Sequence, residues 1–195
     1  MRKIVQVMSV SLDGFYEGED ADISWHRVDE ELHQYFNDRL RTADAFLDGR
    51  ITHQLMADFW PTADQDPDTS PQMAEFAGIW REMPKYLYST TLRTADWNTT
   101  VVPRVDPDEV RALKAGGDGE LVLGGARLGD TFRRLGLIDV YRVYVHPVLV
   151  GRGTPFFNPD GATPAPPPAD LRLTGTRTFG NGVVELCHEV TATAL

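Results

Sequence analysis

The sequence has little cysteine, little positive charge and no long apolar run. Cys187 is the only cysteine among 195 residues, which excludes a disulfide framework. Lysine and arginine together number 19, against 29 aspartates and glutamates, so the formal net charge is −10 at pH 7. Because nucleic acids and anionic membranes repel a negative surface, we expect neither as the main partner.

The apolar residues are dispersed rather than gathered in one segment. No stretch approaches the roughly 20 apolar residues of a membrane span, and polar Gln6 and Ser9 interrupt the first apolar stretch too early for a signal peptide. We therefore expect a cytoplasmic protein, in which a lone thiol stays reduced. The 42% hydrophobic content suffices for a sizeable core, and the length predicts a single domain over residues 1–195.

The hydrophobic pattern predicts alternating strands and helices in the first part of the chain. The expected strands cover residues 3–10, 45–47, 85–88, 100–102 and 121–123. The expected helices begin near Asp29, Arg50, Pro71, Pro107 and Ala126. The all-apolar segment 121–123 is typical of a parallel strand that is covered on both faces.

The pattern changes after residue 138, because strands then follow one another without helices between them. They cover residues 139–146, 171–178 and 182–190, with a hairpin turn expected at 180–182. A loop at 153–170 carries six prolines, a length typical of a functional loop or an arm. The expected fold class is therefore α/β, with a mixed, mainly parallel central sheet flanked by helices and an antiparallel C-terminal hairpin.

Three junctions at the ends of expected strands could hold a ligand: Gly49-Arg50-Ile51-Thr52, Gly124-Gly125-Ala126-Arg127, and Ser89-Thr90-Thr91 with Arg93 nearby. Free N–H groups at a helix start favour an anion, and glycine lets a ligand approach the backbone. A single glycine between strand and helix is more often ordinary turn chemistry. Three such junctions together favour a long ligand with several phosphates, although neither Gly-x-Gly-x-x-Gly nor a Walker loop is present.

Several motifs, taken in chain order, resemble the dihydrofolate reductase-like superfamily. They are Ser11-Leu12-Asp13-Gly14-Phe15, Asp48-Gly49-Arg50-Ile51-Thr52, Ser89-Thr90-Thr91-Leu92, Gly124-Gly125, Gly136-Leu137-Ile138-Asp139 and Pro147-x-Leu149-x-Gly151-x-Gly153-x-Pro155-x-Phe157. The chain is most similar to the C-terminal reductase domain of the bifunctional riboflavin-biosynthesis deaminase–reductases. This resemblance implies a stand-alone, three-layer reductase that transfers a hydride from NADPH to a small heterocyclic or carbonyl substrate. It also implies a homodimer, in which the 153–170 arm could reach the partner.

The resemblance also assigns residues to NADPH. Those that match the pyrophosphate contacts are Gly49, Arg50 and Thr52 on one side and Gly124, Gly125, Ala126, Arg127 and Leu128 on the other. Ser89, Thr90 and Arg93 match the place that holds the adenosine 2′-phosphate. The nicotinamide would lie near Ser9 and Asp13.

A hydride transfer to a C=N or C=O bond needs a proton for the other atom. The resemblance places a carboxylate on the helix after the Trp-containing loop, which makes Glu31 the first choice among Asp29, Glu30 and Glu31, with Asp13 as a second candidate. Acidic residues in a first helical turn also simply stabilise the helix dipole. Trp25 and Trp60 could form the walls of a flat substrate site, or could serve core packing.

The sequence departs from the riboflavin reductases in the segment after the first junction. Those enzymes carry an Asp-Asn-Pro-x-Leu-Thr-type segment that holds the ribose phosphate of their substrate, whereas residues 56–61 here read Met-Ala-Asp-Phe-Trp-Pro. We therefore expect a diverged substrate pocket. The histidines and Cys187 lack the spacing of metal ligands or of a nucleophile, so we expect no metal site. Two alternatives stay open: a sensor that binds NADPH or another nucleotide without turnover, and a dimeric scaffold without a ligand.

Overall fold

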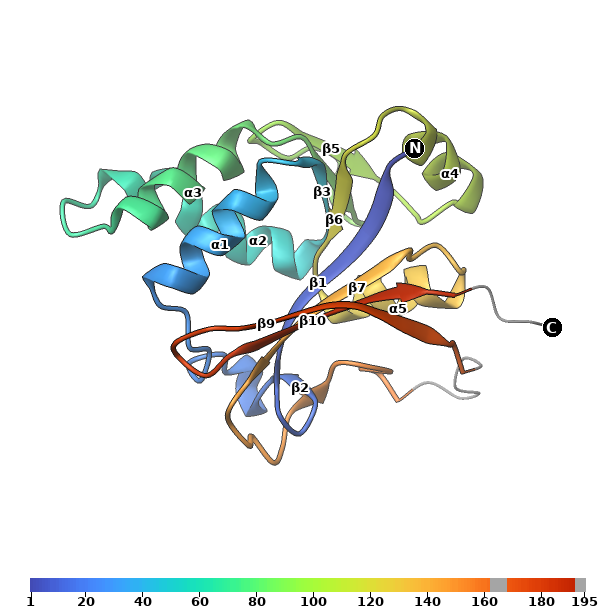
Figure 1. Cartoon of the computed structure of the whole chain (residues 1–195). Helices are drawn as coiled ribbons and strands as arrows, with labels where there is room; N and C mark the ends of the chain where they lie inside the picture. The colour runs from blue at the N-terminus through green and yellow to red at the C-terminus, as the bar shows by residue number, and fades with distance from the viewer. Residues whose placement is uncertain (162–167, 192–195) are drawn as a thin grey trace.

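An eight-stranded sheet forms the centre of the computed structural model, which describes residues 1–161 and 168–191 (Figure 1). Its strands are β1 Lys3–Ser11, β3 Ala43–Gly49, β4 Lys85–Tyr88, β5 Thr99–Val102, β6 Glu120–Leu123, β7 Val140–His146, β9 Leu171–Thr178 and β10 Val184–Val190. Their order is β5-β4-β3-β6-β1-β7-β10-β9. All pairs from β5 to β7 are parallel, whereas β10 pairs antiparallel with both β7 and β9.

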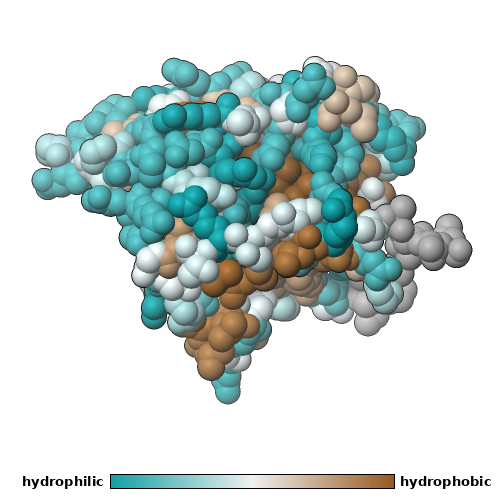
Figure 2. All heavy atoms as spheres, viewed as in Figure 1, coloured by the Kyte–Doolittle hydropathy of each residue, from teal (hydrophilic) through white to brown (hydrophobic). Residues whose placement is uncertain are grey.

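Helices cover both faces of the sheet. The α-helices among the described residues are α1 Glu30–Leu40, α2 Arg50–Phe59, α3 Pro71–Glu82, α4 Pro107–Ala115 and α5 Ala126–Arg134, and the 3-10 helices are η1 Glu19–Ala21 and η2 Trp60–Gln65. None of the helices in the described part of the chain is both long enough and apolar enough to span a membrane. The surface over α1 and α3 is almost entirely hydrophilic in the view of Figure 2, as expected for helices that turn one face to water.

The alternation of side chains along the strands builds a separate core on each face. Phe46 of β3 packs with Phe76 and Trp80 of α3 on one face. Its neighbour Leu47 belongs to the other core, together with Phe132 of α5. The sheet is therefore the middle layer of three, with α1 and α3 on one side and α4 and α5 on the other.

The predicted fold class is confirmed, including the antiparallel C-terminal strands. The prediction missed two short strands, β2 Phe15–Glu17 and β8 Thr154–Pro155, which pair with each other outside the main sheet. Segments of two or three residues are too short to show an alternating pattern. The prediction also did not include η2, because a 3-10 turn needs no amphipathic repeat. Three prolines of the predicted arm, Pro164, Pro166 and Pro167, lie outside the described residues.

Candidate functional site

Two hollows meet at the carboxyl ends of the central strands. The first, which we call the glycine cleft, has a volume of about 450 Å³ and is bordered by residues 49–52 and 124–128. The second, which we call the apolar pocket, has a volume of about 270 Å³. Val7, Met8 and His26 line both hollows. A ligand in the cleft and a second one in the pocket would therefore lie next to each other.

Parallel pairing brings the two glycine junctions together. Leu47 of β3 lies opposite Leu123 of β6, and the N–H of Gly124 donates a hydrogen bond to the Leu47 carbonyl at 2.9 Å. Gly49 precedes α2 and Gly125 precedes α5, so both helices start at the same edge of the sheet. The residues predicted to contact a pyrophosphate thus border one cleft, at the sheet edge where ligands of open α/β proteins bind.

The N-termini of α2 and α5 differ from those of the other α-helices in the described chain. Asp29, Ser70 and Asp106 cap α1, α3 and α4 by accepting backbone N–H bonds with their side chains. The N-cap residues of α2 and α5 are glycines, Gly49 and Gly125, so neither N-cap supplies a side chain that accepts a hydrogen bond from the first turn. Uncapped backbone N–H groups at a helix start favour an anion. The two uncapped helices are the two that border the glycine cleft.

Glycine is required at the second junction by its geometry. Gly125 has φ +81°, and a Cβ atom there would lie 2.6 Å from the Thr52 hydroxyl. A Cβ at Gly124 would lie 2.6 Å from a carboxyl oxygen of Asp48. Side chains at these positions would fill the space between the two junctions, so the glycines keep the backbone open to a ligand.

Two arginines give the cleft local positive charge in a protein of net charge −10. Arg50, at the start of α2, is exposed and donates to Gln54 Oε1 at 3.3 Å. Arg127, in the first turn of α5, pairs with Asp160 at 2.9 Å, and both side chains are largely exposed. Exposed pairs of this kind contribute little free energy. Both guanidinium groups can therefore turn to a bound anion at low cost.

A buried carboxyl group lies directly behind the glycine junction. Asp48, at 4% exposure, ends β3 next to Gly49. Burial raises its pKa to about 7, against the opposing effect of the Lys85 charge. An anion bound near Gly124 would raise this pKa further, because a second negative charge disfavours the carboxylate. Asp48 is therefore partly protonated at neutral pH and sensitive to what the cleft holds.

The apolar pocket lies between the sheet and helices α1 and α3. Most of its walls are apolar side chains from three strands and two helices: Val7, Met8, Phe36, Leu40, Phe46, Phe76 and Val122. Ser9, His26, Arg39, Arg142 and Tyr144 supply the polar atoms. An apolar hollow with a few polar groups is typical of a small-molecule site.

His26 is the one titratable side chain, among the described residues, that lines both hollows. Its Nε2 is buried and has no hydrogen-bond partner in the described chain. Burial lowers the pKa of His26, while a hydrogen bond to the Tyr16 backbone and the charge of Asp22 oppose this shift. The ring stacks on that of His146, with ring centres 5.2 Å apart. His146 is neutral at physiological pH, because burial and the neighbouring charges lower its pKa to about 4.

The two predicted acids lie elsewhere. The Asp13 carboxylate accepts hydrogen bonds from the Ser11 hydroxyl and from the backbone of Val150 and Gly151, and the Ser11 bond, aided by those of the two loop amides, lowers its pKa despite some desolvation. Asp13 therefore holds the β1 turn against the loop after β7. Glu31 is exposed and accepts from the Gly180 N–H at 3.0 Å and from Arg177 at 3.4 Å. It borders a separate shallow hollow on the outer side of α1.

Some of the other predicted contact residues line the apolar pocket or pack against its walls, and the rest lie outside both hollows. Ser9 lines the apolar pocket. Trp60 packs on Phe76, a wall of that pocket, and Trp25 packs edge-on against His26. Ser89, Thr90 and Arg93 follow β4, the strand next to β3, and lie outside the lining of the glycine cleft. The Ser89 hydroxyl is used locally, because it accepts from the N–H groups of Thr91 and Leu92.

A comparison with protein-family models matches residues 2–185 to the RibD C-terminal domain. The chain belongs to the RibD C-terminal domain family. The chain is 32% identical in sequence to the uncharacterized protein YyaP of Bacillus subtilis over 188 residues, which cover 96% of this chain and 94% of YyaP.

Solved structures show the same fold at low sequence identity. A putative riboflavin biosynthesis protein from Shewanella sp. PV-4 has a TM-score of 0.72 at 18% identity, covering 97% of this chain and 99% of that chain. Dihydrofolate reductase from Enterococcus faecalis, in a complex with NADP(H), has a TM-score of 0.61 at 13% identity and covers 97% of each chain. The predicted resemblance to the RibD reductase domain and to the dihydrofolate reductase-like fold is thus confirmed.

For this RibD-family chain, sequence reasoning missed most of the apolar pocket. The histidines were interpreted as ordinary, yet His26 lies at the junction of the hollows. Arg142 was part of an expected strand and drew no attention, although a charged residue between apolar neighbours in a central strand is a usable signal. Among the described residues, no group of three or more His, Cys, Asp or Glu side chains could hold a metal ion.

Proposed function

We propose that the protein is an NADPH-dependent reductase that binds its cofactor in the glycine cleft and a small heterocyclic or carbonyl substrate in the apolar pocket. The observation that carries this proposal is that two helices, each with a glycine at its N-cap and no side-chain cap, start at one cleft, and that this cleft shares a wall with the apolar pocket. The family and the neighbouring dihydrofolate reductase with its NADP(H) support the choice of cofactor.

The residues present fit such a cofactor. Gly124 and Gly125 keep open a cradle that a Cβ atom would fill, and the first N–H groups of α2 and α5 would bind the diphosphate. Arg50 and Arg127 would add positive charge, and Thr52 a hydroxyl donor. When bound, NADPH supplies the hydride. Val7, Met8 and His26 would border the reacting end, because they are shared by cleft and pocket.

We assign the proton donor to His26 rather than to Glu31 or Asp13. The ring reaches both hollows, whereas Glu31 lies in neither and the bonds of Asp13 keep it ionised. With one ring nitrogen bonded to the Tyr16 backbone, Nε2 is the free nitrogen, and it carries a proton only in the imidazolium form. His26 can thus donate a proton to a substrate atom in the pocket and recover it from water.

The proposal is tested first by binding. NADPH fluorescence should saturate on titration with the protein, and Arg50→Ala should weaken binding roughly tenfold by removing a charged phosphate contact. Arg111→Ala is the matched control, because Arg111 is an exposed arginine at the other end of the sheet, on α4. Absence of binding at millimolar NADPH would reject the proposal and leave the scaffold alternative.

Turnover is tested second, by NADPH oxidation with a panel of dihydropterins, pyrimidinones and aldehydes. Oxidation that depends on one of these acceptors supports a reductase. Tight binding without oxidation of NADPH by any member of the panel would favour the sensor instead.

A further inference from the structure

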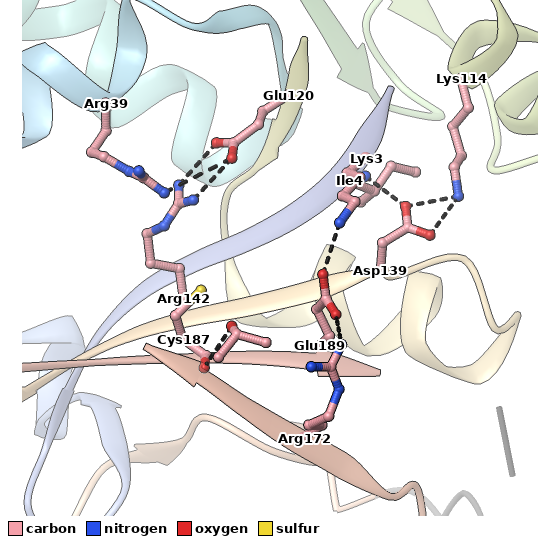
Figure 3. Close-up of polar contacts among 11 residues, drawn as sticks. Lys3, Ile4, Arg39, Lys114, Glu120, Asp139, Arg142, Arg172, Cys187 and Glu189 are labelled. Atoms are coloured by element: carbon pink, nitrogen blue, oxygen red, sulfur yellow. Dashed lines mark hydrogen bonds and ion pairs between the residues drawn. The ribbon is translucent and has the colours of Figure 1, made fainter. Parts of the chain in front are cut away.

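The polar end of the apolar pocket holds two arginines whose charges are already paired. Arg142 of β7 is 3% exposed and donates two hydrogen bonds to the Glu120 carboxylate, both of 3.0 Å. Arg39 of α1 approaches the same carboxylate from the helix side, at 3.9 Å. Figure 3 shows the two guanidinium groups next to each other, both turned towards the Glu120 carboxylate. Burial of Arg142 disfavours its charge, but the bonds to Glu120 outweigh burial and raise its pKa, so this pair stays ionised.

A second carboxyl group closes the other side of Arg142. Glu185 of β10 lies 3.6 Å from Arg142 Nε and accepts hydrogen bonds from the hydroxyls of Tyr144 and Tyr35 at 3.1 and 2.9 Å. Two arginines and two glutamates therefore meet here, and their formal charges cancel. A phosphate group entering the pocket would find no unpaired positive charge and would lie close to two carboxyl groups.

Two hydrogen-bond donors nevertheless remain unused. Nε of Arg39 and Nε of Arg142 are both buried, and neither has a hydrogen-bond partner in the described part of the chain. Buried donors in natural proteins are almost always satisfied. Nε of Arg142 faces Glu185 at 3.6 Å, so the donor left for a ligand is Nε of Arg39. Because Arg39 lines the pocket, a neutral acceptor such as a carbonyl oxygen would satisfy this donor without adding charge.

We infer that the apolar pocket selects a flat, uncharged ring compound with a carbonyl-type acceptor and excludes phosphorylated substrates. Its volume of about 270 Å³ lies at the small end of ligand sites, and aromatic side chains from α1, β3 and α3 form its walls. This inference rests on the proposed function, since it names the substrate class of the same site. It identifies Glu120 and Glu185 as residues that set specificity by neutralising the arginines.

A matched pair of probes tests the predicted exclusion of phosphorylated compounds. 4-Methoxybenzaldehyde and 4-formylphenyl phosphate share a flat ring and a carbonyl, but only the second carries a phosphate. Binding of each to the NADP⁺-loaded protein is measured by calorimetry, after NADP⁺ binding itself has been measured. We expect the phosphate compound to bind at least about tenfold more weakly. Equal or tighter binding of the phosphate compound, or saturable binding of neither probe at millimolar concentration, would overturn the inference.

Charge-neutralising variants sharpen the test. Glu120→Gln should shift the preference about tenfold towards the phosphate compound, because it leaves an unpaired guanidinium in the pocket. Glu185→Gln should do the same if Glu120→Gln does not fold. Its amide oxygen still accepts from one tyrosine, and its NH2 group can donate to the hydroxyl oxygen of the other. Glu109→Gln, on the exposed face of α4, is the control and should change nothing. If NADP⁺ does not bind, the proposed function fails; if it binds and these variants leave the preference unchanged, this inference alone fails.

Discussion

The glycine cleft and the apolar pocket are neighbours built in opposite ways. The anion-binding end of the cleft is formed by backbone, from glycines and two helix starts without side-chain caps, with two arginines at the rim. The pocket is formed by side chains from distant segments, with its charges paired inside the protein. A backbone cradle suits a ligand that a whole family shares, whereas a side-chain pocket can change its ligand through single substitutions. The difference predicts that changes in one hollow leave the other largely intact.

The largest expected effect is on turnover and concerns His26, which lines both hollows. A substitution there should lower the rate of the reaction but leave cofactor binding nearly unchanged. His26→Gln should lower turnover of an accepted substrate by about 100- to 1,000-fold, because the glutamine amide does not ionise and cannot act as a general acid. NADPH affinity should change by less than about twofold. In the unsubstituted protein, turnover should fall as pH rises through the lowered pKa of His26, because only the imidazolium donates.

These predictions are checked by pH profiles of kcat and by fluorescence titration, with His188→Gln on β10 as the control. Turnover of His26→Gln within threefold of the unsubstituted protein, or an unchanged pH profile, would remove His26 from the chemistry.

A pair of glycine substitutions tests the cleft alone. Gly125→Ala should weaken NADPH binding by more than about tenfold, because the new methyl group would enter the cradle between the junctions. Gly136→Ala is the matched control, since Gly136 also has positive φ, +64°, but no atom lies within 4 Å of a Cβ built there. Both substitutions place a Cβ on a residue with positive φ, so equal losses of affinity would show that this strain, not the cradle, is responsible.

The smallest expected effect concerns the carboxyl group behind the cleft. Because a bound anion favours protonated Asp48, NADP⁺ affinity should rise as pH falls from 8.5 to 6.5, through its pKa of about 7. We expect the contribution of Asp48 to be about fivefold across this range. Asp48→Asn should remove this contribution to the pH dependence of NADP⁺ affinity. The pH dependence that comes from the cofactor's own phosphate should remain. Calorimetry at both pH values measures the difference; identical pH dependence in the two proteins would place Asp48 too far from the anion to matter.

The sequence predicts the glycine cleft well and the apolar pocket poorly. Gly49, Gly124 and Gly125 stand out because a glycine between a buried strand and a helix is a local pattern, and parallel pairing then brings the two junctions together. The pocket has no local pattern: Phe46, Phe76 and Val122 look like ordinary core residues, and only packing of α1 and α3 on the sheet joins them. Glu31 illustrates the limit, since its spacing suggested an acid but its side chain turns to the loop after β9.

The central claim, that cleft and pocket form one site with the reacting end of the cofactor at their junction, is tested most directly at Met8. Its methyl group, labelled with ¹³C and assigned with Met8→Leu, should show nuclear Overhauser effects to the nicotinamide protons of bound NADPH, because Met8 lines both hollows. Met83, at the end of α3, should show none. Saturating NADPH that leaves the Met8 methyl unchanged would contradict the account.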